Sequence, residues 1–218
     1  MLYVFDAYGI LFDFNAAIGR HRAAAGPEAD RFSENWRQKQ IEYTWTHTLA
    51  GRYVDFWTLT QRALDYTFDR VPSVDRRLRQ DLLDCYFKLD AFPDARAVLG
   101  ALKNRGDATA ILSNGTPPML AAAVTAAGLS DLLDAVLSVD TIRMYKPRSE
   151  VYALVTAHFS VTPADVTFVS SNRWDAMGAT AFGFRTVWVN RANAPAEYGD
   201  FPPVVTANDL AGVLSLSR

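Results

Sequence analysis

The chain has 218 residues, half of them hydrophobic, and a formal net charge of -2. A chain of this length and composition can bury a full core, which excludes an intrinsically disordered protein. With almost no net charge and no block of lysine or arginine, it lacks the electrostatic signature of a protein that binds nucleic acid or an anionic membrane. We therefore expect a globular α/β protein that binds neither.

Cysteine usage and the N-terminal sequence indicate the compartment. The only cysteine, Cys85, cannot form an internal disulfide, which suits a reducing environment and a buried, inert thiol. The apolar N-terminus is interrupted by Asp6 and Asp13 and has neither a basic lead nor a small-residue cleavage pattern. We therefore expect no signal peptide and no spanning helix, and we predict a cytoplasmic protein.

The first expected strand ends on an acid. A short apolar run reaches Phe5 and is followed by Asp6 and then by small or turn-forming residues. In α/β proteins such a run presents a carboxylate at the carboxyl edge of a parallel sheet, where these sheets bind ligands. Asp6 is therefore a candidate nucleophile. Tyr8 stands where a phosphoryl-transferring relative would normally carry a second acid to protonate the leaving oxygen.

The next part of the chain, from Phe14 to Asp90, has no convincing strand and carries many aromatic residues at helical spacing. We predict that residues 14–92 form a helical cap inserted after the first strand. The core would then consist of residues 1–13 and 93–218, with Pro93 at the return from the cap.

Within this insertion, Ser33 is expected to cap a helix. Four residues at intervals of four share one drifting stripe of that helix: Arg37, Ile41, Trp45 and Leu49. From helix spacing alone, Arg37 is best explained as a surface cation that covers apolar neighbours with its stem or pairs with Glu34.

The remainder of the chain alternates strand and helix patterns. Expected strands cover 108–112, 135–139, 166–169 and 186–189, and each of the first three precedes polar residues. Expected helices cover 95–105, 117–127, 150–159, 176–182 and a short final segment near 208–214. This alternation predicts a doubly wound, Rossmann-like parallel sheet.

Polar groups cluster at the ends of these strands. They are Asp6 and Tyr8, Ser113 and Asn114, Lys146, and the group Ser170, Asn172 and Asp175. A carboxylate nucleophile needs a cation or amide donors to hold it and a second acid to activate water, and this set supplies all three. Each residue alone has a structural explanation as a helix cap, a turn former or a solvated charge. Their joint placement predicts an active site.

Five segments carry a family resemblance. They are Phe5-Asp6-Ala7-Tyr8-Gly9, the run from Trp36 to Trp45, Leu112-Ser113-Asn114-Gly115, Tyr145-Lys146-Pro147 with Tyr152, and Ser170-Ser171-Asn172-Arg173-Trp174-Asp175. On these segments the chain resembles the L-2-haloacid dehalogenases of the haloacid dehalogenase superfamily over nearly its whole length. The strand-end acid and the lysine are common to the superfamily. Tyr8, the cap segment and the Ser-Ser-Asn-x-Trp-Asp run are specific to the dehalogenases.

The resemblance implies a hydrolase acting on carbon–halide bonds, which converts short L-2-haloacids to D-2-hydroxy acids and halide. Asp6 would attack the halogen-bearing carbon, and water would then hydrolyse the aspartyl ester. Arg37 and Asn114 would receive the halide, and Ser113 would bind the substrate carboxylate.

The other roles implied by the resemblance concern the nucleophile, the water and the pocket. Lys146 would orient Asp6. The water would be positioned by Ser170, Asn172 and Asp175. The pocket would be shaped by Tyr8, Tyr152 and Trp174. No metal or other cofactor is implied, because the leaving halide is already an anion. The expected partners are the haloacid, the halide and a second copy of the chain in a homodimer.

One position departs from the family pattern, and two alternative functions remain open. The family usually has threonine where this chain has Ile10, so one hydroxyl that can hydrogen-bond a catalytic carboxylate is lost. A slower enzyme or a shifted substrate preference is the expected consequence. A non-catalytic binding protein on this fold is one alternative, although decay would be expected to scatter losses among the site residues, and none is lost.

The second alternative is a magnesium-dependent phosphatase of the same superfamily. Asp6 and Asp175 supply two oxygen ligands of the kind that Mg²⁺ requires. Tyr8, however, replaces the proton donor, and Ser171-Asn172 stands where phosphatases usually have a Gly-Asp pair. Both features favour dehalogenation.

Overall fold

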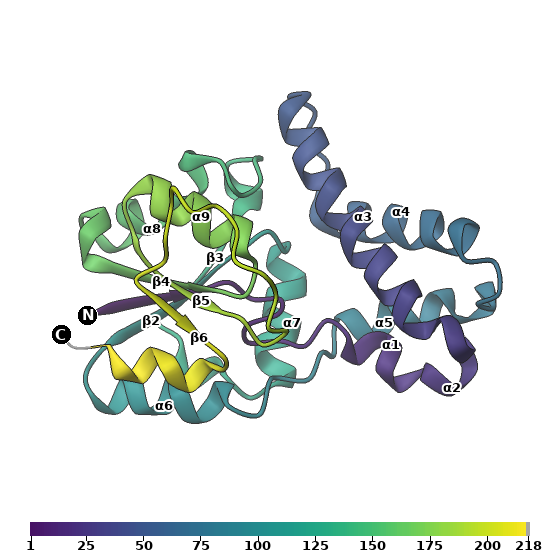
Figure 1. The fold of residues 1–218 in the computed structure, drawn as a ribbon, viewed down its shortest axis with the longest axis horizontal. Coiled ribbons are helices and arrows are strands. Elements are labelled where there is room, and N and C mark those ends of the chain that lie inside the picture. Colours follow the sequence, from purple (N-terminus) through teal and green to yellow (C-terminus); the bar gives the residue numbers. More distant parts are fainter. Residues whose placement is uncertain (217–218) are drawn as a thin grey trace.

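The computed structural model describes residues 1–216 and contains one six-stranded parallel sheet (Figure 1). Its strands are β1 (Leu2–Phe5), β2 (Ala108–Ser113), β3 (Ala135–Ser138), β4 (Val166–Ser170), β5 (Arg185–Val189) and β6 (Val205–Ala207). Their order in the sheet is β3-β2-β1-β4-β5-β6, and all neighbours are parallel. The predicted doubly wound sheet is thereby confirmed. The edge strand β6 was not predicted, because three residues are too few to show a period.

Strand β1 lies at the point where the strand order reverses, between β2 and β4, and all its residues are buried. Phe5 pairs with Ile111 on one side and Val169 on the other. This register places Asp6 one step beyond the paired residues, and its N–H donates to the Val169 carbonyl oxygen at 2.9 Å. Open parallel sheets bind ligands at such reversal points, outside the carboxyl ends of their strands.

Four helices and a terminal 3₁₀ helix accompany the sheet. They are α6 (Ala95–Asn104), α7 (Pro117–Ala126), α8 (Ser149–Phe159), α9 (Arg173–Phe182) and η6 (Leu210–Ser215). Helix α8 packs beside α9 on one side of the sheet, and α6 packs beside η6 on the other (Figure 1). Helix α9 begins three residues earlier than expected, at Arg173, which places Asp175 in its first turn.

The predicted insertion consists of helices joined by turns. Its helices are α1 (Ala16–Arg20), α2 (Arg22–Ala25), α3 (Ala29–Leu49), α4 (Phe56–Arg70) and α5 (Arg79–Tyr86), and they lie together beside the sheet core (Figure 1). Asp55 caps α4 by accepting from the Thr58 N–H at 2.9 Å. Across residues 1–216, no helix combines the length and the apolar character that crossing a bilayer requires.

The chain passes between sheet and cap through two linkers that run side by side. The Asp13 N–H donates to the Asp90 carbonyl oxygen and the Phe92 N–H donates to that of Leu11, both at 2.9 Å. Phe12 and Ala91 form an antiparallel bridge between these bonds. This pairing lies within two residues of the predicted domain boundaries, which remain a prediction.

In the insertion, the expected helix cap at Ser33 is wrong, whereas the expected burial of Cys85 is confirmed. Ser33 does not cap a helix, because α3 already begins at Ala29, directly after a 3₁₀ turn that contains Pro27. The Ser33 hydroxyl instead donates to Asn15 Oδ1 at 2.8 Å and ties α3 to the start of α1. Cys85 is buried as expected, but the fold brings His21 Nε2 to 3.6 Å from its sulfur, a neighbour that the local sequence does not show.

A second contact joins cap and core near the predicted site. Tyr53, in the α3–α4 loop, donates a hydrogen bond to Asp140, and its ring stacks on that of Tyr145 with 5.2 Å between centroids. The Tyr145 hydroxyl donates to the Val54 carbonyl oxygen at 2.6 Å. Because Tyr145 directly precedes Lys146, these contacts connect the cap loop to the segment that carries the predicted lysine.

Candidate active site

The centre of the predicted site is a buried lysine between two carboxylates. Lys146 Nζ donates to Asp6 Oδ1 at 3.1 Å and to Asp175 Oδ2 at 2.9 Å. Burial opposes the charge on Lys146, but the attraction of Asp175 and Asp6 outweighs it and raises the pKa of the ammonium. The three side chains therefore form one charge-compensated cluster at the carboxyl edge of the sheet.

Asp6 is held by three donors that come from three different parts of the chain. Besides the lysine, the Ala7 N–H donates to Oδ1 and Asn172 Nδ2 donates to Oδ2, each at 2.9 Å. Both oxygens are thus fixed in direction, and Asp6 retains a small exposed fraction of 6%. A carboxylate with this fixed geometry suits in-line attack on a bound carbon.

Asp175 lies in the first turn of α9 and is completely buried. Ser170 Oγ donates to its Oδ2 at 3.0 Å, and Tyr152 Oη donates to its Oδ1 at 2.8 Å. Burial raises the pKa of the Asp175 carboxyl to about 6; the attraction of Lys146 opposes this shift, and the charge of Asp6 adds to it. A carboxyl that titrates near neutral pH suits general acid–base work.

Ser113 and Asn114, at the end of β2, present donors beside this cluster. Ser113 Oγ accepts from the Gly115 N–H at 3.1 Å, and Asn114 Oδ1 accepts from the Lys146 N–H at 3.2 Å. In both bonds the side-chain oxygen of Ser113 or Asn114 is the acceptor. Among the described residues, the Ser113 hydroxyl hydrogen and the Asn114 amide hydrogens have no acceptor, so both groups can donate to a ligand.

Arg37 extends from α3 of the cap and does not pair with Glu34. Its Nη1 donates to Gln40 Oε1 at 2.7 Å, and its guanidinium carbon lies 5.0 Å from the centroid of the Phe14 ring. No carboxylate within residues 1–216 forms an ion pair with it. Burial raises the pKa of the Tyr8 hydroxyl, and the positive charge of Arg37 opposes this shift.

Tyr8 is buried next to this arginine with an unused hydroxyl. Its ring stacks on Phe56 with 5.9 Å between centroids and tilts against Tyr86 at 6.1 Å. The hydroxyl has no hydrogen-bond partner in the described part of the chain. Burial raises the pKa of Tyr8 far above its usual range, so the group is a neutral donor. Buried polar groups are normally satisfied, and this one therefore indicates a ligand position.

Two other aromatic residues expected in the pocket have different neighbours. Tyr152 is completely buried and packs edge-on against Phe168 at 5.7 Å, so its contacts are those of a core residue that also holds Asp175. Trp174 packs edge-to-face against Trp45 of the cap at 5.3 Å. Trp174 thus lies at the contact between cap and core.

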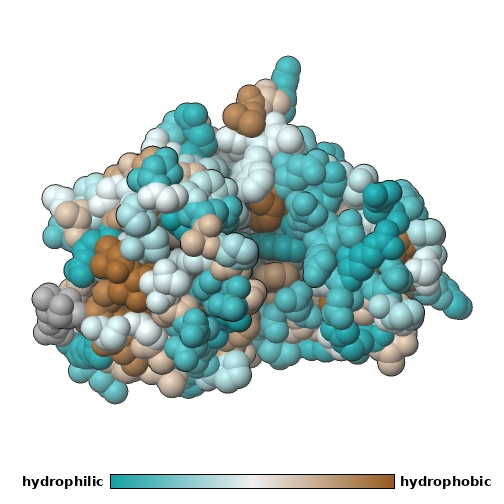
Figure 2. All heavy atoms as spheres, in the orientation of Figure 1, coloured by the Kyte–Doolittle hydropathy of each residue, from teal (hydrophilic) through white to brown (hydrophobic). Residues whose placement is uncertain are grey.

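Several cavities reach the site. One of 380 Å³ is lined by Trp45, Lys146 and Trp174, and one of 500 Å³ by Asn172 and Trp174 among others. A third, of 520 Å³, reaches Arg37 from the cap side. Figure 2 shows that the surface is hollowed between the core on the left and the cap on the right, with hydrophilic residues around much of the hollow.

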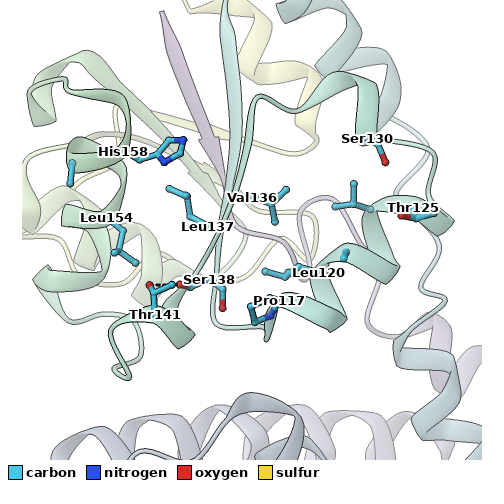
Figure 3. A pocket seen from close by; sticks show the side chains of 13 residues that line it. Pro117, Leu120, Thr125, Ser130, Val136, Leu137, Ser138, Thr141, Leu154 and His158 are labelled. Atoms are coloured by element: carbon cyan, nitrogen blue, oxygen red, sulfur yellow. Dashed lines mark hydrogen bonds between the residues drawn. The ribbon is translucent and has the colours of Figure 1, made fainter.

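A cavity of 760 Å³ lies elsewhere, against the edge strand β3 (Figure 3). Leu120 of α7, Val136 of β3 and Leu154 of α8 contribute to its mostly apolar lining. It contains no carboxylate, lysine or arginine and none of the predicted site residues. This cavity therefore lacks the charged groups that make the cluster around Lys146 the candidate site.

The donor set fits a lysine better than a divalent metal. The phosphatase alternative requires Mg²⁺ on Asp6 and Asp175, but the Lys146 ammonium lies between these two carboxylates. Within residues 1–216, no group of three or more histidine, cysteine or acidic side chains has the arrangement of a metal site. All four carboxylate oxygens of Asp6 and Asp175 already accept hydrogen bonds from the protein.

The sequence did not predict two residues that contact Arg37 or its partner. Gln40 lies three positions after Arg37 on the same helix, a spacing that places side chains together and was a usable signal. Tyr86 donates to Gln40 Oε1 at 3.4 Å across 46 positions of sequence, and no local pattern indicates that contact.

The structure combines a parallel sheet, an aspartate directly after its strand β1 and a group of helices beside the sheet. The family model for haloacid dehalogenase-like hydrolases matches residues 1–183. The chain therefore belongs to the haloacid dehalogenase-like hydrolases.

Within this family, the chain is similar to proteins named as haloacid dehalogenases. The chain is 50% identical over 200 residues to (S)-2-haloacid dehalogenase 1 of Pseudomonas sp. (strain CBS-3), which covers 91% of this chain and 88% of that protein. Among solved structures, a dehalogenase has a TM-score of 0.96 at 42% identity, covering 100% of this chain and 97% of the other. The L-2-haloacid dehalogenase of Xanthobacter autotrophicus with covalently bound chloropropionic acid has a TM-score of 0.86 at 36% identity, covering 99% of each chain.

Proposed function

We propose that this chain is a hydrolytic dehalogenase that converts short L-2-haloacids to D-2-hydroxy acids and halide through an ester on Asp6. The observation that carries the proposal is the network in which Lys146, Asn172 and the Ala7 N–H hold Asp6. The (S)-2-haloacid dehalogenase relatives, 35–50% identical over most of their length, support the same reaction.

In the first step, an oxygen of Asp6 attacks the carbon that carries the halogen from the side opposite the halogen. A carbon–oxygen bond forms, and the carbon–halogen bond breaks with its electron pair leaving on the halide. The configuration at carbon inverts once, so an L-acid yields a D-product. Fixing the carboxylate and the substrate in line can contribute about 7–11 kcal/mol of the barrier reduction. The chloropropionic acid bound covalently in the Xanthobacter relative supports an ester intermediate.

The free donors around Asp6 support the binding of two anionic groups. Arg37, the Asn114 amide and the unpartnered Tyr8 hydroxyl would receive the departing halide. The Ser113 hydroxyl would bind the substrate carboxylate. Charge-assisted bonds of this kind are about twice as strong as neutral ones, and they strengthen as charge develops on the halide.

In the second step, water attacks the carbonyl carbon of the Asp6 ester. Asp175 would take the proton from that water, while Ser170 and Asn172 help to position it. The ester bond breaks on the aspartyl side, and the leaving oxygen takes the proton back from Asp175. The hydroxy acid is released, Asp6 is restored as a carboxylate with one oxygen from water, and the second proton of the water passes to solvent. Asp175 serves this step in its ionised form, which dominates above the pKa of about 6.

The decisive experiment measures halide release from the two enantiomers of 2-chloropropanoate, with and without EDTA. We expect release from the (S)-enantiomer only, at a rate that EDTA leaves unchanged. Phosphate ester hydrolysis with added Mg²⁺ is measured in parallel. Turnover of phosphate esters without haloacid turnover would support the phosphatase alternative, and no turnover of either would support a binding protein.

We also propose that the protein acts as a homodimer in the cytoplasm, with a cap formed by residues 14–92. The single cysteine suits a reducing compartment, and the exposed Leu49 at the end of α3 gives a second copy an apolar contact. Sedimentation velocity tests the dimer, and limited proteolysis between residues 88 and 94 tests the boundary. A monomer at micromolar concentration would contradict the dimer.

A further inference from the structure

Gln40 is a fully buried amide one turn after Arg37 on α3. Glutamine side chains are seldom buried completely, because an unpaired amide in the interior costs stability. The amide of Gln40 is paired on both sides. Its Nε2 lies 2.6 Å from Thr60 Oγ1 on α4, and its Oε1 lies 2.7 Å from Arg37 Nη1.

The hydrogen bonds of Thr60 fix which way this amide points. The Thr60 hydroxyl has one hydrogen and donates it to the Phe56 carbonyl oxygen at 2.7 Å. Toward Gln40 it can therefore only accept, so the nitrogen of the amide must face Thr60. The oxygen then faces Arg37, and it accepts a second, longer bond from Tyr86 Oη at 3.4 Å. The indole of Trp36 donates to the Thr60 carbonyl oxygen at 2.9 Å and anchors the same turn of α4.

We propose that Gln40 is a positioning residue for Arg37, held in orientation by Thr60, and that this relay aims the guanidinium at the departing halide. The inference rests on the halide-binding role of Arg37 proposed above. Gln40 itself touches neither substrate nor reacting atoms in this scheme. It acts only through the arginine.

The arrangement explains how a long, flexible arginine stays in place with its charge uncompensated. Arginine side chains lose considerable freedom when fixed, and Arg37 also lies over the face of the Phe14 ring and interacts with the Tyr86 hydroxyl. A carboxylate partner would hold the guanidinium more strongly, but it would also neutralise the charge that a halide needs. A neutral carbonyl oxygen holds one edge of the fork and leaves the full positive charge for the anion.

The sharpest test uses two threonines of the same helix. Thr60 and Thr67 are both fully buried, and each donates to the carbonyl oxygen four residues earlier at 2.7 Å. Only Thr60 also accepts from Gln40. Thr60→Val removes that acceptor and frees the amide to turn its nitrogen toward Arg37. Thr67→Val makes the same chemical change without touching the relay.

Single-turnover measurements with excess enzyme separate the two chemical steps. We expect Thr60→Val to slow halide release about tenfold and Gln40→Met about ten- to a hundredfold, the range typical of misplaced catalytic groups. Hydrolysis of the Asp6 ester should keep its parental rate in both variants, because Lys146, Asn172 and Asp175 lie outside the relay. Thr67→Val should leave both steps unchanged.

Two further measurements distinguish a misoriented Arg37 guanidinium from general damage to the cap. The defect of Thr60→Val should be larger with 2-chloropropanoate than with 2-bromopropanoate, since chloride is the poorer leaving group and depends more on its donors. Gln40→Glu should still anchor Arg37 but neutralise it, which slows halide release and weakens inhibition by added bromide.

The outcomes separate this inference from the proposed function. Equal losses in Thr60→Val and Thr67→Val, or parental halide release in Thr60→Val, would overturn the role of the relay. Retention of parental rates by Arg37→Lys would instead remove the halide role of the arginine and the relay with it. Absence of halide release from the parental protein would contradict the proposed function itself.

Discussion

The sheet edge and the cap contribute to this site in opposite ways. At the sheet edge, the carboxylates of Asp6 and Asp175 each accept three hydrogen bonds from residues of the protein. On the cap side of the site, Arg37 of α3 has no carboxylate partner among the described residues. The Tyr8 hydroxyl likewise has no hydrogen-bond partner among them. The two carboxylates are saturated by donors of the protein, whereas Arg37 and Tyr8, like Ser113 and Asn114 at the end of β2, have donors to spare.

This difference indicates a division of labour. A saturated, buried network holds its geometry through two chemical steps, which suits the formation and hydrolysis of an ester. Unused donors suit an anion that is absent at the start, appears as the bond breaks and then leaves. The two regions are joined by the paired linkers and by aromatic contacts such as Tyr53–Tyr145 and Trp45–Trp174. Variants in each region should therefore affect different steps.

The largest effect should follow from changing the nucleophile. Asp6→Asn replaces a carboxylate by a poor nucleophile and should lower halide release by about 10⁴-fold or more, as loss of the nucleophile does in other covalent enzymes. A single turnover in ¹⁸O-water should place the label in the Asp6 carboxylate of the parental enzyme. Mass spectrometry of the peptide that contains Asp6 measures it. Label in the first hydroxy acid instead would exclude the ester intermediate.

The next largest effects should come from Arg37 in the cap and Asp175 at the sheet edge, and the two variants should slow different steps. Arg37→Lys replaces a planar fork by a point charge and should slow halide release about a hundredfold with little loss of stability. Asp175→Asn should instead permit one burst of halide and then trap the ester. Rapid-quench analysis distinguishes the two patterns. A burst followed by trapping in Arg37→Lys would mean that the cap also serves the second step.

The sequence predicted the sheet edge well because strand ends follow a local rule. A buried apolar run followed by polar residues identifies the carboxyl end of a strand, and parallel pairing brings such ends together. The local sequence alone therefore predicts Asp6, Ser113 and Ser170 at the carboxyl edge of the sheet. Lys146 and Asp175 follow from the same rule with the family resemblance added.

The cap was predicted less well because its contacts connect distant helices. Helix periodicity placed Arg37 on a surface stripe, whereas its neighbours depend on how α3 packs against α4 and α5. The contact of Tyr86 with Gln40 and that of Trp45 with Trp174 have no local signature. The start of α3 was missed because Ser33 suits a helix cap, whereas the helix in fact begins after the 3₁₀ turn that contains Pro27.

The pH dependence should separate the two steps again. The pKa of Asp175 is raised to about 6, so the base form needed for ester hydrolysis should decline below that pH, by about tenfold per unit. Halide release in the first turnover should decline less. Stopped-flow and quench measurements from pH 5 to 8 test this. A second step that is flat across this range would exclude Asp175 as the base.

The raised pKa of Asp175 also makes the stability of the folded protein depend on pH. The folded protein binds the Asp175 proton more tightly than the unfolded chain, whose carboxyl has a pKa near 3.8. The contribution of this group to stability is therefore fully present below pH 3.8 and lost as the pH rises to about 6. Asp175→Asn should remove that part of the pH dependence. Denaturant unfolding of the two proteins at pH 4 and pH 6.5 measures the difference.

The smallest effect on catalysis should come from Ile10, the position at which the family usually has threonine. Ile10 is completely buried, and Asp6 and Asp175 each accept three bonds without any hydroxyl from this position. We therefore expect Ile10→Thr to change halide release by less than about threefold. Because the new hydroxyl would be buried without a clear partner, the free energy of unfolding should fall by about 1–3 kcal/mol.

Denaturant unfolding and single-turnover rates of Ile10→Thr are measured together, with Ile10→Val as the control that shortens the side chain without adding a hydroxyl. Ile10→Val should lose about 0.5–1.5 kcal/mol of stability through the cavity alone. A markedly faster enzyme with unchanged stability in Ile10→Thr would show that the hydroxyl finds a carboxylate after all. The sheet edge would then be less saturated than its hydrogen bonds indicate, and the contrast with the cap would weaken accordingly.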